Sequence, residues 1–168
     1  MNVDRTDLET ILAEISAHYE RNYIDLMRPK LGLTNIEDGD TELIEDWRKY
    51  LQDNELDYTS SFRRLATRIA ASDTELFGEF EQRWRQRVGN QGIKSAEAVG
   101  LMNSVNPLFI ARNHRVEQAI SKAVAGDLTV FEDLNVVLAR PFEAQPQFAH
   151  YAEAPEPHER VTQTFCGT

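Results

Sequence analysis

The stretch SDTELFGEFEQRWRQRV (residues 72–88) indicates most clearly which kind of secondary structure this chain forms. Ser72 and Glu75 have the spacing of a capping box, in which each side chain bonds the backbone N–H of the other residue. The apolar residues that follow recur at intervals of three and four, which places them on one face of a helix: Leu76, Phe77, Phe80, Trp84 and Val88. We therefore expect a helix that Ser72 caps and that buries this face.

The same spacing predicts further helices on both sides of this stretch. The first runs from Leu8 and closes at Pro29 and Gly32, with the apolar residues Leu8, Ile11, Leu12, Ile15, Tyr19, Tyr23 and Met27 in one stripe. Others are expected from Asp40 as a cap, from near Asp57, over residues 95–104, from Asn106 as a cap with Pro107 in the first turn, and from the capping box Thr129/Glu132.

The fold class that follows is all-α, with six or seven amphipathic helices, because no alternating run of β-branched residues argues for a sheet. Phe131 is expected to face inward on the last helix. The predicted core consists of Trp47, Phe62, Phe80, Trp84, Phe109, Ile120 and Leu134. Residues 1–140 are expected to form one helical domain. Residues 141–168 hold four of the six prolines and are expected to form an irregular, extended tail that carries the single cysteine, Cys166.

Composition restricts the partners. The net charge of −10 opposes binding to nucleic acid and to anionic lipid surfaces. No apolar run approaches the roughly 20 residues of a membrane helix. From the early acidic residues we expect neither a secretory signal nor a transit peptide. One cysteine cannot form an internal disulfide, which suits a reducing compartment, and we expect a cytoplasmic protein without a nucleic-acid or membrane partner.

The devices that hold a nucleotide or a metal are missing from the sequence. There is no GxGxxG and no GxxxxGK[ST] stretch, and neither a DFG nor an HRD triplet occurs. The triplet Asn113-His114-Arg115 is only faintly similar to HRD and falls inside a predicted helix. No histidine pair has HExxH spacing. We therefore expect no catalytic, cofactor-binding or metal-binding residue in this chain, and no catalysis by the chain alone.

Several short motifs in the last third of the chain occur together in a fixed order: Met102 to Pro107, Arg112-Asn113, Gln118 to Ile120, Gly126-Asp127 and Arg140 to Phe142. In this order they closely resemble the C-terminal region of the selenoprotein O family of protein adenylyltransferases. Upstream, residues 27–33 and 57–63 are similar to the preceding helices of that family, so the resemblance spans about residues 15–168.

The resemblance implies that the chain is the helical C-terminal part of a protein-kinase-like fold. Members of the family bind ATP with magnesium or a similar metal and transfer AMP to hydroxyl groups of proteins. Their nucleotide-binding and metal-binding residues lie in the N-terminal two-thirds, which this chain lacks. Cys166 matches the terminal cysteine or selenocysteine of the family, thought to have a redox role. The tail departs from the family at His158 and around Cys166.

Two roles remain open on the sequence. In the first role, the chain is the C-terminal helical part of an adenylyltransferase, which supports the catalytic lobe and delivers Cys166 to it. Arg63, Arg64 and Arg112 are then the candidate docking residues. Alternatively it is a free-standing helical interaction or regulatory protein without catalysis. The partners would be the N-terminal catalytic lobe or protein substrates. An in-frame kinase-like segment in the DNA just upstream would favour the first role.

Overall fold

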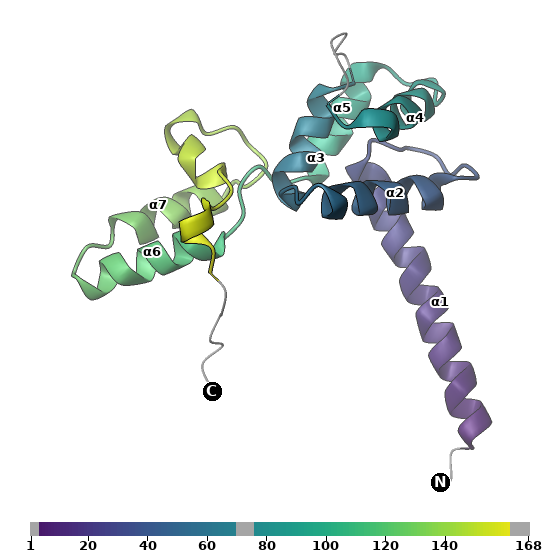
Figure 1. Cartoon of the computed structure of the whole chain (residues 1–168), viewed down its shortest axis with the longest axis horizontal. Coiled ribbons are helices and arrows are strands. Elements are labelled where there is room, and N and C mark those ends of the chain that lie inside the picture. The colour runs from purple at the N-terminus through teal and green to yellow at the C-terminus, as the bar shows by residue number, and fades with distance from the viewer. Residues whose placement is uncertain (1–3, 70–75, 162–168) are drawn as a thin grey trace.

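The computed structural model describes residues 4–69 and 76–161, and these residues form helices and no strand (Figure 1). The all-α prediction is therefore confirmed. The helices are α1 (Arg5–Lys30), α2 (Asp40–Asp53), α3 (Tyr58–Thr67), α4 (Gly78–Gly89), α5 (Ser95–Val105), α6 (Asn113–Val124) and α7 (Thr129–Leu138), followed by the 3₁₀ helices η1 (Pro146–Ala152) and η2 (Pro157–Glu159). None of the helices formed by these described residues is both long and apolar enough to cross a membrane.

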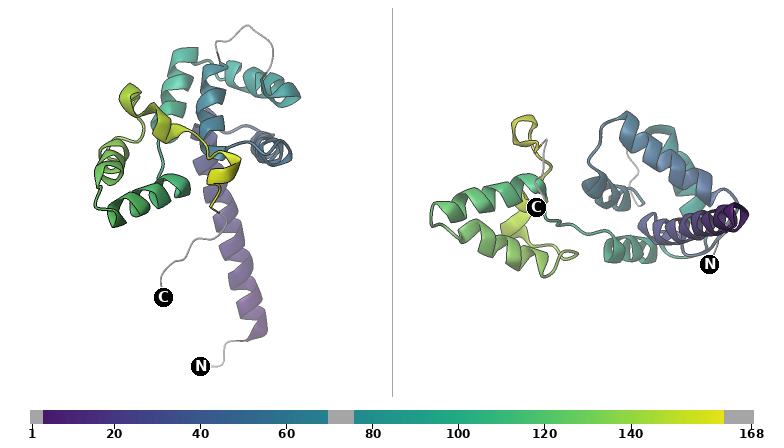
Figure 2. Two further views of the ribbon diagram at one scale, coloured as in Figure 1. Left: turned by 60° about the vertical axis from the view of Figure 1, so that its left-hand side comes forward. Right: turned by 90° about the horizontal axis from the view of Figure 1, so that it is seen from below.

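The helices are arranged in two units, which are separated most clearly in the right-hand view of Figure 2. Helices α1–α5 form the N-terminal unit. Helices α6 and α7 with η1 and η2 form the C-terminal unit, and the segment 106–112 connects the two. Each unit has its own cluster of buried apolar side chains, so the fold contains two cores.

The core of the N-terminal unit is built around two tryptophans that are fully buried. The ring of Trp47 lies 5.6 Å from that of Phe62 and 4.8 Å from that of Phe80, centroid to centroid. The indole N–H of Trp84 donates to the carbonyl oxygen of Leu31 at 2.8 Å, which satisfies a polar group that burial would otherwise leave unpaired. All four aromatic residues predicted for this core are therefore buried where the sequence placed them.

The core of the C-terminal unit is smaller. It consists of Phe109, Ala119, Leu134, Val137 and Tyr151. Phe109 and Leu134 are buried as predicted, but Ile120 and Phe131 are each 52% exposed, so the prediction was wrong for both. The physical reason is that α6 and α7 contact each other and the tail covers only part of their surface, which leaves one apolar side of each helix in solvent.

The tail, as far as residue 161, lies over α6 and α7 and does not extend away from them. Tyr151 of η1 is buried, and its hydroxyl donates to Asp133 Oδ2 of α7 at 3.1 Å. The backbone N–H groups of Leu108 and Phe109 both donate to the carbonyl oxygen of Pro141. The predicted division of the chain at residue 140 stays a prediction.

The N-terminal half of α1 lies away from the other helices (Figure 1). The helix has 26 residues, which corresponds to about 39 Å, and only its C-terminal part packs against α2 and α5. Five apolar residues of the predicted stripe lie on this free half and are between 47% and 70% exposed: Leu8, Ile11, Leu12, Ile15 and Tyr19. We call these five residues the apolar stripe of α1.

The start of α4 differs from the prediction. The capping box Ser72/Glu75 falls within residues 70–75, outside the described residues, and α4 begins only at Gly78. The preceding turn is instead held by Glu81 of α4, whose carboxylate is fully buried. The backbone N–H groups of Leu76 and Phe77 donate to its Oε2 at 2.8 and 3.0 Å.

The carboxylate of Glu81 also accepts hydrogen bonds from two arginine side chains. Arg68 Nε donates to Glu81 Oε1 at 2.9 Å, and Arg85 Nε donates to the same oxygen at 3.0 Å. Burial by itself raises the pKa of Glu81, but the hydrogen bonds from Arg85, Arg68 and the two backbone N–H groups outweigh burial and hold the pKa below its ordinary value. The carboxylate therefore stays charged and links Arg68, at the end of α3, to α4 and to the two residues that precede α4.

Three predicted helix caps that fall on described residues are wrong. Asn106 ends α5 instead of starting α6, and its side-chain amide donates to the carbonyl oxygen of Lys30 at 2.8 Å. Asp40 is the first residue of α2 after the left-handed Gly39, and its carboxylate accepts from Arg87 Nε at 2.7 Å. Helix α7 has no side-chain cap from Thr129. In the first two cases, a partner distant in sequence takes the polar group that would have capped a helix.

Candidate functional site at the start of helix α6

The two units are joined by an ion pair at the start of α6. Arg112 is the N-cap residue of α6, and its Nη1 and Nη2 donate to the two carboxylate oxygens of Asp57 at 2.8 and 3.0 Å. Asp57 is in turn the N-cap of α3, because its Oδ1 accepts from Ser60 N at 2.8 Å. This bidentate contact is the main cause that lowers the pKa of the Asp57 carboxyl far below its ordinary value.

The other two predicted docking arginines lie on α3. Arg63 Nη1 donates to Asn103 Oδ1 of α5 at 2.6 Å, and Arg63 Nη2 donates to the carbonyl oxygen of Phe142 at 2.5 Å, so it also bridges the units. Arg64 is exposed, and its guanidinium lies 5.9 Å from the ring centroid of Phe77. Arg63 and Arg112 therefore have partners within the chain; a docking role for all three arginines stays a prediction.

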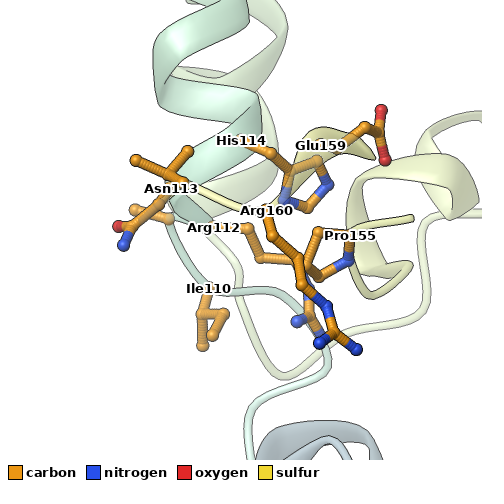
Figure 3. Close-up of a pocket in the computed structure, with 9 residues that line it drawn as sticks. Ile110, Arg112, Asn113, His114, Pro155, Glu159 and Arg160 are labelled. Carbon is orange, nitrogen blue, oxygen red and sulfur yellow. The ribbon is translucent and has the colours of Figure 1, made fainter. Parts of the chain in front are cut away.

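A pocket of about 490 Å³ opens where the linker meets the first turn of α6 and the end of the tail (Figure 3). We call it the α6 pocket. The linker and the first turn of α6 contribute one wall, and the segment around η2 contributes the other. Its lining residues are Ile110, Ala111, Arg112, Asn113, His114, Pro155, Glu159, Arg160 and Val161.

The side chain of His114 is the most unusual group in this pocket. The residue is 7% exposed, and its Nε2 atom has no hydrogen-bond partner among the described residues. Burial lowers the pKa of His114, and the neighbouring charges of Arg115 and Arg112 lower it further, whereas Glu159 opposes them. The imidazole is therefore neutral at neutral pH and has one ring nitrogen free to bind a ligand atom.

A second atom without a hydrogen-bond partner, besides His114 Nε2, belongs to Arg112, which also lines the α6 pocket. Its Nε is buried and has no hydrogen-bond partner in the described part of the chain, although both Nη atoms bind Asp57. A buried N–H without a partner costs about 1–3 kcal/mol. Two such groups, on residues two positions apart that both line this pocket, are the polar atoms that a bound ligand would satisfy.

Arg160 and Glu159 complete the wall that the tail provides. Arg160 is exposed, and it also lines a neighbouring pocket of about 670 Å³ formed with Arg48 and Tyr58 of the N-terminal unit. In Figure 3 the carboxylate of Glu159 points away from the guanidinium groups of Arg112 and Arg160. Its Oε2 accepts the backbone N–H of Glu156 at 3.0 Å. The carboxylate of Glu159 thus has a hydrogen-bond partner in the tail and does not pair with the two guanidinium groups.

The remaining predicted site residue, Cys166, lies outside the described residues. Within residues 4–69 and 76–161, no three His, Cys, Asp or Glu side chains are placed to hold a metal ion together. The absence of nucleotide and metal sites from the whole chain stays a prediction. The sequence missed His114 and Arg160, because the predicted sixth helix began at Asn106 and placed His114 inside it, whereas the helix begins at Asn113.

Comparison with known proteins identifies the family. The family model described as protein adenylyltransferase SelO matches residues 1–139. Among curated proteins, the protein nucleotidyltransferase YdiU of Rhizobium meliloti (strain 1021) is 43% identical over 169 residues, which cover 94% of this chain and 34% of that relative. Its counterpart in Bradyrhizobium diazoefficiens is 42% identical, with 95% of this chain and 35% of the relative covered.

The chain thus spans about a third of the length of the curated relatives that it matches. The match includes the linker, the first turn of α6 and Arg112, since the family model extends to residue 139. The expected resemblance is confirmed: this chain belongs to the protein adenylyltransferase SelO family.

Proposed function

We propose that this chain is the C-terminal helical part of a protein adenylyltransferase, and that it docks onto and supports the catalytic part. In the whole protein, the reaction would be the transfer of AMP from ATP to serine, threonine or tyrosine hydroxyls of protein substrates. Two findings support the proposal. The relatives carry the name nucleotidyltransferase, and two-thirds of their length has no counterpart in this chain.

The apolar stripe of α1 is the observation that carries the docking role. Leu8, Ile11, Leu12 and Ile15 are each between 47% and 62% exposed on a helix half that no other described element covers. Removing such half-exposed side chains from water stabilises a contact by about 1 kcal/mol each. A contiguous stripe of this kind marks an interaction surface on a helix. The occupant that we propose is the part of the relatives, about two-thirds of their length, that this chain does not match.

The described residues of this chain place no group of metal-ligating side chains together that could hold magnesium. We therefore assign ATP, magnesium and the chemical step to the catalytic part, and assign to this chain only the docking surface. Cys166 enters the proposal as a candidate regulatory thiol through the family resemblance alone. The single cysteine also supports a cytoplasmic location, where thiols stay reduced.

The test is a complementation experiment. The catalytic part is taken from the Rhizobium meliloti relative by removing the third that matches this chain, and the two pieces are mixed. We expect a one-to-one complex in sedimentation velocity and an increase in AMP transfer to a protein substrate over the catalytic part alone. A catalytic part that is fully active alone and does not bind this chain would contradict the proposal.

Two matched variants make the test specific for α1. Ile15→Asp places a charge in the apolar stripe, whereas Val124→Asp places the same charge on an 86% exposed valine at the end of α6. Both substitutions should leave the helical content unchanged, since both side chains are largely exposed. We expect Ile15→Asp to abolish complex formation and Val124→Asp to leave it intact. Equal binding by both variants would exclude the apolar stripe as the docking surface.

A further inference from the structure

We propose that the α6 pocket is a binding site for an oxyanion of the phosphate class, either inorganic phosphate or the phosphate group of a small phosphomonoester. The site is separate from the apolar stripe of α1, and the inference does not depend on the proposed docking. It rests on the three features that such a ligand requires: unpartnered donors, a helix start and an unneutralised cation.

The unpartnered donors are the buried side-chain nitrogens of Arg112 and His114. Arg112 is 6% exposed and His114 is 7% exposed, and one nitrogen of each lacks a partner among the described residues. A neutral imidazole protonated on Nε2 donates one hydrogen bond, and the guanidinium Nε–H donates another. A phosphate oxygen accepts both, whereas a cation has no acceptor atom to offer either N–H.

The helix start contributes in the same direction. Asn113 and His114 are the first two residues of α6 and both line the pocket. The first N–H groups of a helix have no partner within the helix, and the helix dipole adds about half a positive charge at this end. Helix starts with free N–H groups are common phosphate sites. The 12 residues of α6 make the helix long enough for this effect.

Arg160 provides the cation, because no carboxylate among residues 4–69 and 76–161 pairs with it. The two Nη atoms of Arg112 are committed to Asp57, so Arg112 contributes little net charge. Arg160 is exposed at the mouth of the pocket, and Glu159 directs its carboxylate away from both guanidinium groups (Figure 3). The pocket is larger than one phosphate ion, and Ile110 and Pro155 supply an apolar wall for the organic part of an ester.

The inference is tested by nuclear magnetic resonance on the chain itself. Inorganic phosphate is titrated at constant ionic strength and pH, because exposed charges respond to salt. We expect saturating shifts of the His114 imidazole and of the Asn113 and His114 amides. Phosphate that leaves these signals unchanged would overturn the proposal. Acetate is titrated in parallel, and equal shifts with acetate would show a carboxylate site and would also overturn it.

Variants locate the binding atoms. Arg160→Gln removes the free cation from an exposed position and should weaken phosphate binding at least about tenfold, the loss that corresponds to one charged hydrogen bond. Arg140→Gln removes an exposed arginine in the same unit and should leave the affinity unchanged. The thermal transition of both variants should equal that of the unmodified chain. Phosphate binding that Arg160→Gln and Arg140→Gln affect equally would exclude this pocket.

Discussion

Replacing Arg112 by methionine should separate the two units energetically without opening either core. Arg112 donates two hydrogen bonds to Asp57, and its side chain is 5% exposed, whereas that of Asp57 is 24% exposed. Breaking a fully buried ion pair costs about 3–5 kcal/mol, and exposed pairs contribute about 0.2–1 kcal/mol. Because water can still reach Asp57, we expect Arg112→Met to cost about 2–3 kcal/mol.

The partner variant isolates the pair from the helix cap. Asparagine caps a helix as well as aspartate does, so Asp57→Asn keeps the hydrogen bond from Ser60. It removes the charge and replaces the oxygen that accepts from Arg112 Nη1 with an NH2 group. It also leaves Arg112 buried without a counter-charge and should cost about 3 kcal/mol. In the double variant, a coupling energy of about 2 kcal/mol is expected, because the two residues contact each other directly.

The assay is urea denaturation followed by far-ultraviolet circular dichroism and by tryptophan fluorescence. Trp47 and Trp84 both lie in the core of the N-terminal unit, so fluorescence reports on that unit alone. In the variants, we expect part of the circular dichroism signal to be lost at lower urea than the fluorescence signal. Coincident transitions, with each single variant costing less than about 0.5 kcal/mol, would refute the view that this pair joins the units.

The dependence of this pair on pH has a definite sign. The contact with Arg112 lowers the pKa of Asp57 in the folded chain below its ordinary value of 3.8. A lowered pKa means that the pair stabilises the fold above the unfolded value and that this stabilisation is lost as the pH falls through the folded value. The difference in unfolding free energy between the unmodified chain and Arg112→Met should therefore shrink under acid conditions and stay constant near neutrality.

Four further predictions follow from the cores, the buried carboxylate and the sequence. Trp84→Ala should cost about 3–5 kcal/mol in urea denaturation, whereas Ile120→Ala, at an exposed position, should change the stability by no more than about 0.5 kcal/mol. Glu81→Gln should cost about 3 kcal/mol at neutral pH and less in acid, because the lowered pKa of Glu81 makes its contribution disappear as the carboxylate is protonated. Titration calorimetry with ATP and magnesium should show no micromolar binding to this chain. Under native conditions Cys166 should react with a thiol reagent as fast as in the unfolded chain; reaction only after unfolding would contradict a redox role.

Helix positions and the larger core could be predicted from local spacing, because an amphipathic period is a property of neighbouring residues. Trp47, Phe62 and Trp84 are buried for this reason. The predicted helix caps were wrong where the polar residue binds a partner far along the chain. Asn106 was expected to start a helix and instead bonds Lys30, 76 positions away. The predicted burial of Ile120 was wrong because periodicity identifies an apolar face of a helix but not whether another element covers that face.

The candidate site was predictable only in part. Arg112 was singled out as a docking residue, but its partner Asp57 lies 55 positions away, and no local pattern pairs them. His114 was assigned to the interior of a helix, since the Asn-Pro sequence at 106–107 has the chemistry of a helix start. The pocket exists because the tail folds back and brings Arg160 beside the first turn of α6. The periodicity of apolar residues does not predict where such a tail packs.

The order of the two cores along the chain has a consequence for synthesis on the ribosome. All residues of the larger core precede residue 103, so the N-terminal unit can fold before the C-terminal unit has emerged. Asp57, already fixed at the start of α3, is then in place when Arg112 leaves the exit tunnel. The smaller core, which buries few side chains, would form last and against a surface that is already folded. A chain that ends shortly before residue 112 would therefore contain a folded N-terminal unit in which the carboxylate of Asp57 lacks its partner Arg112.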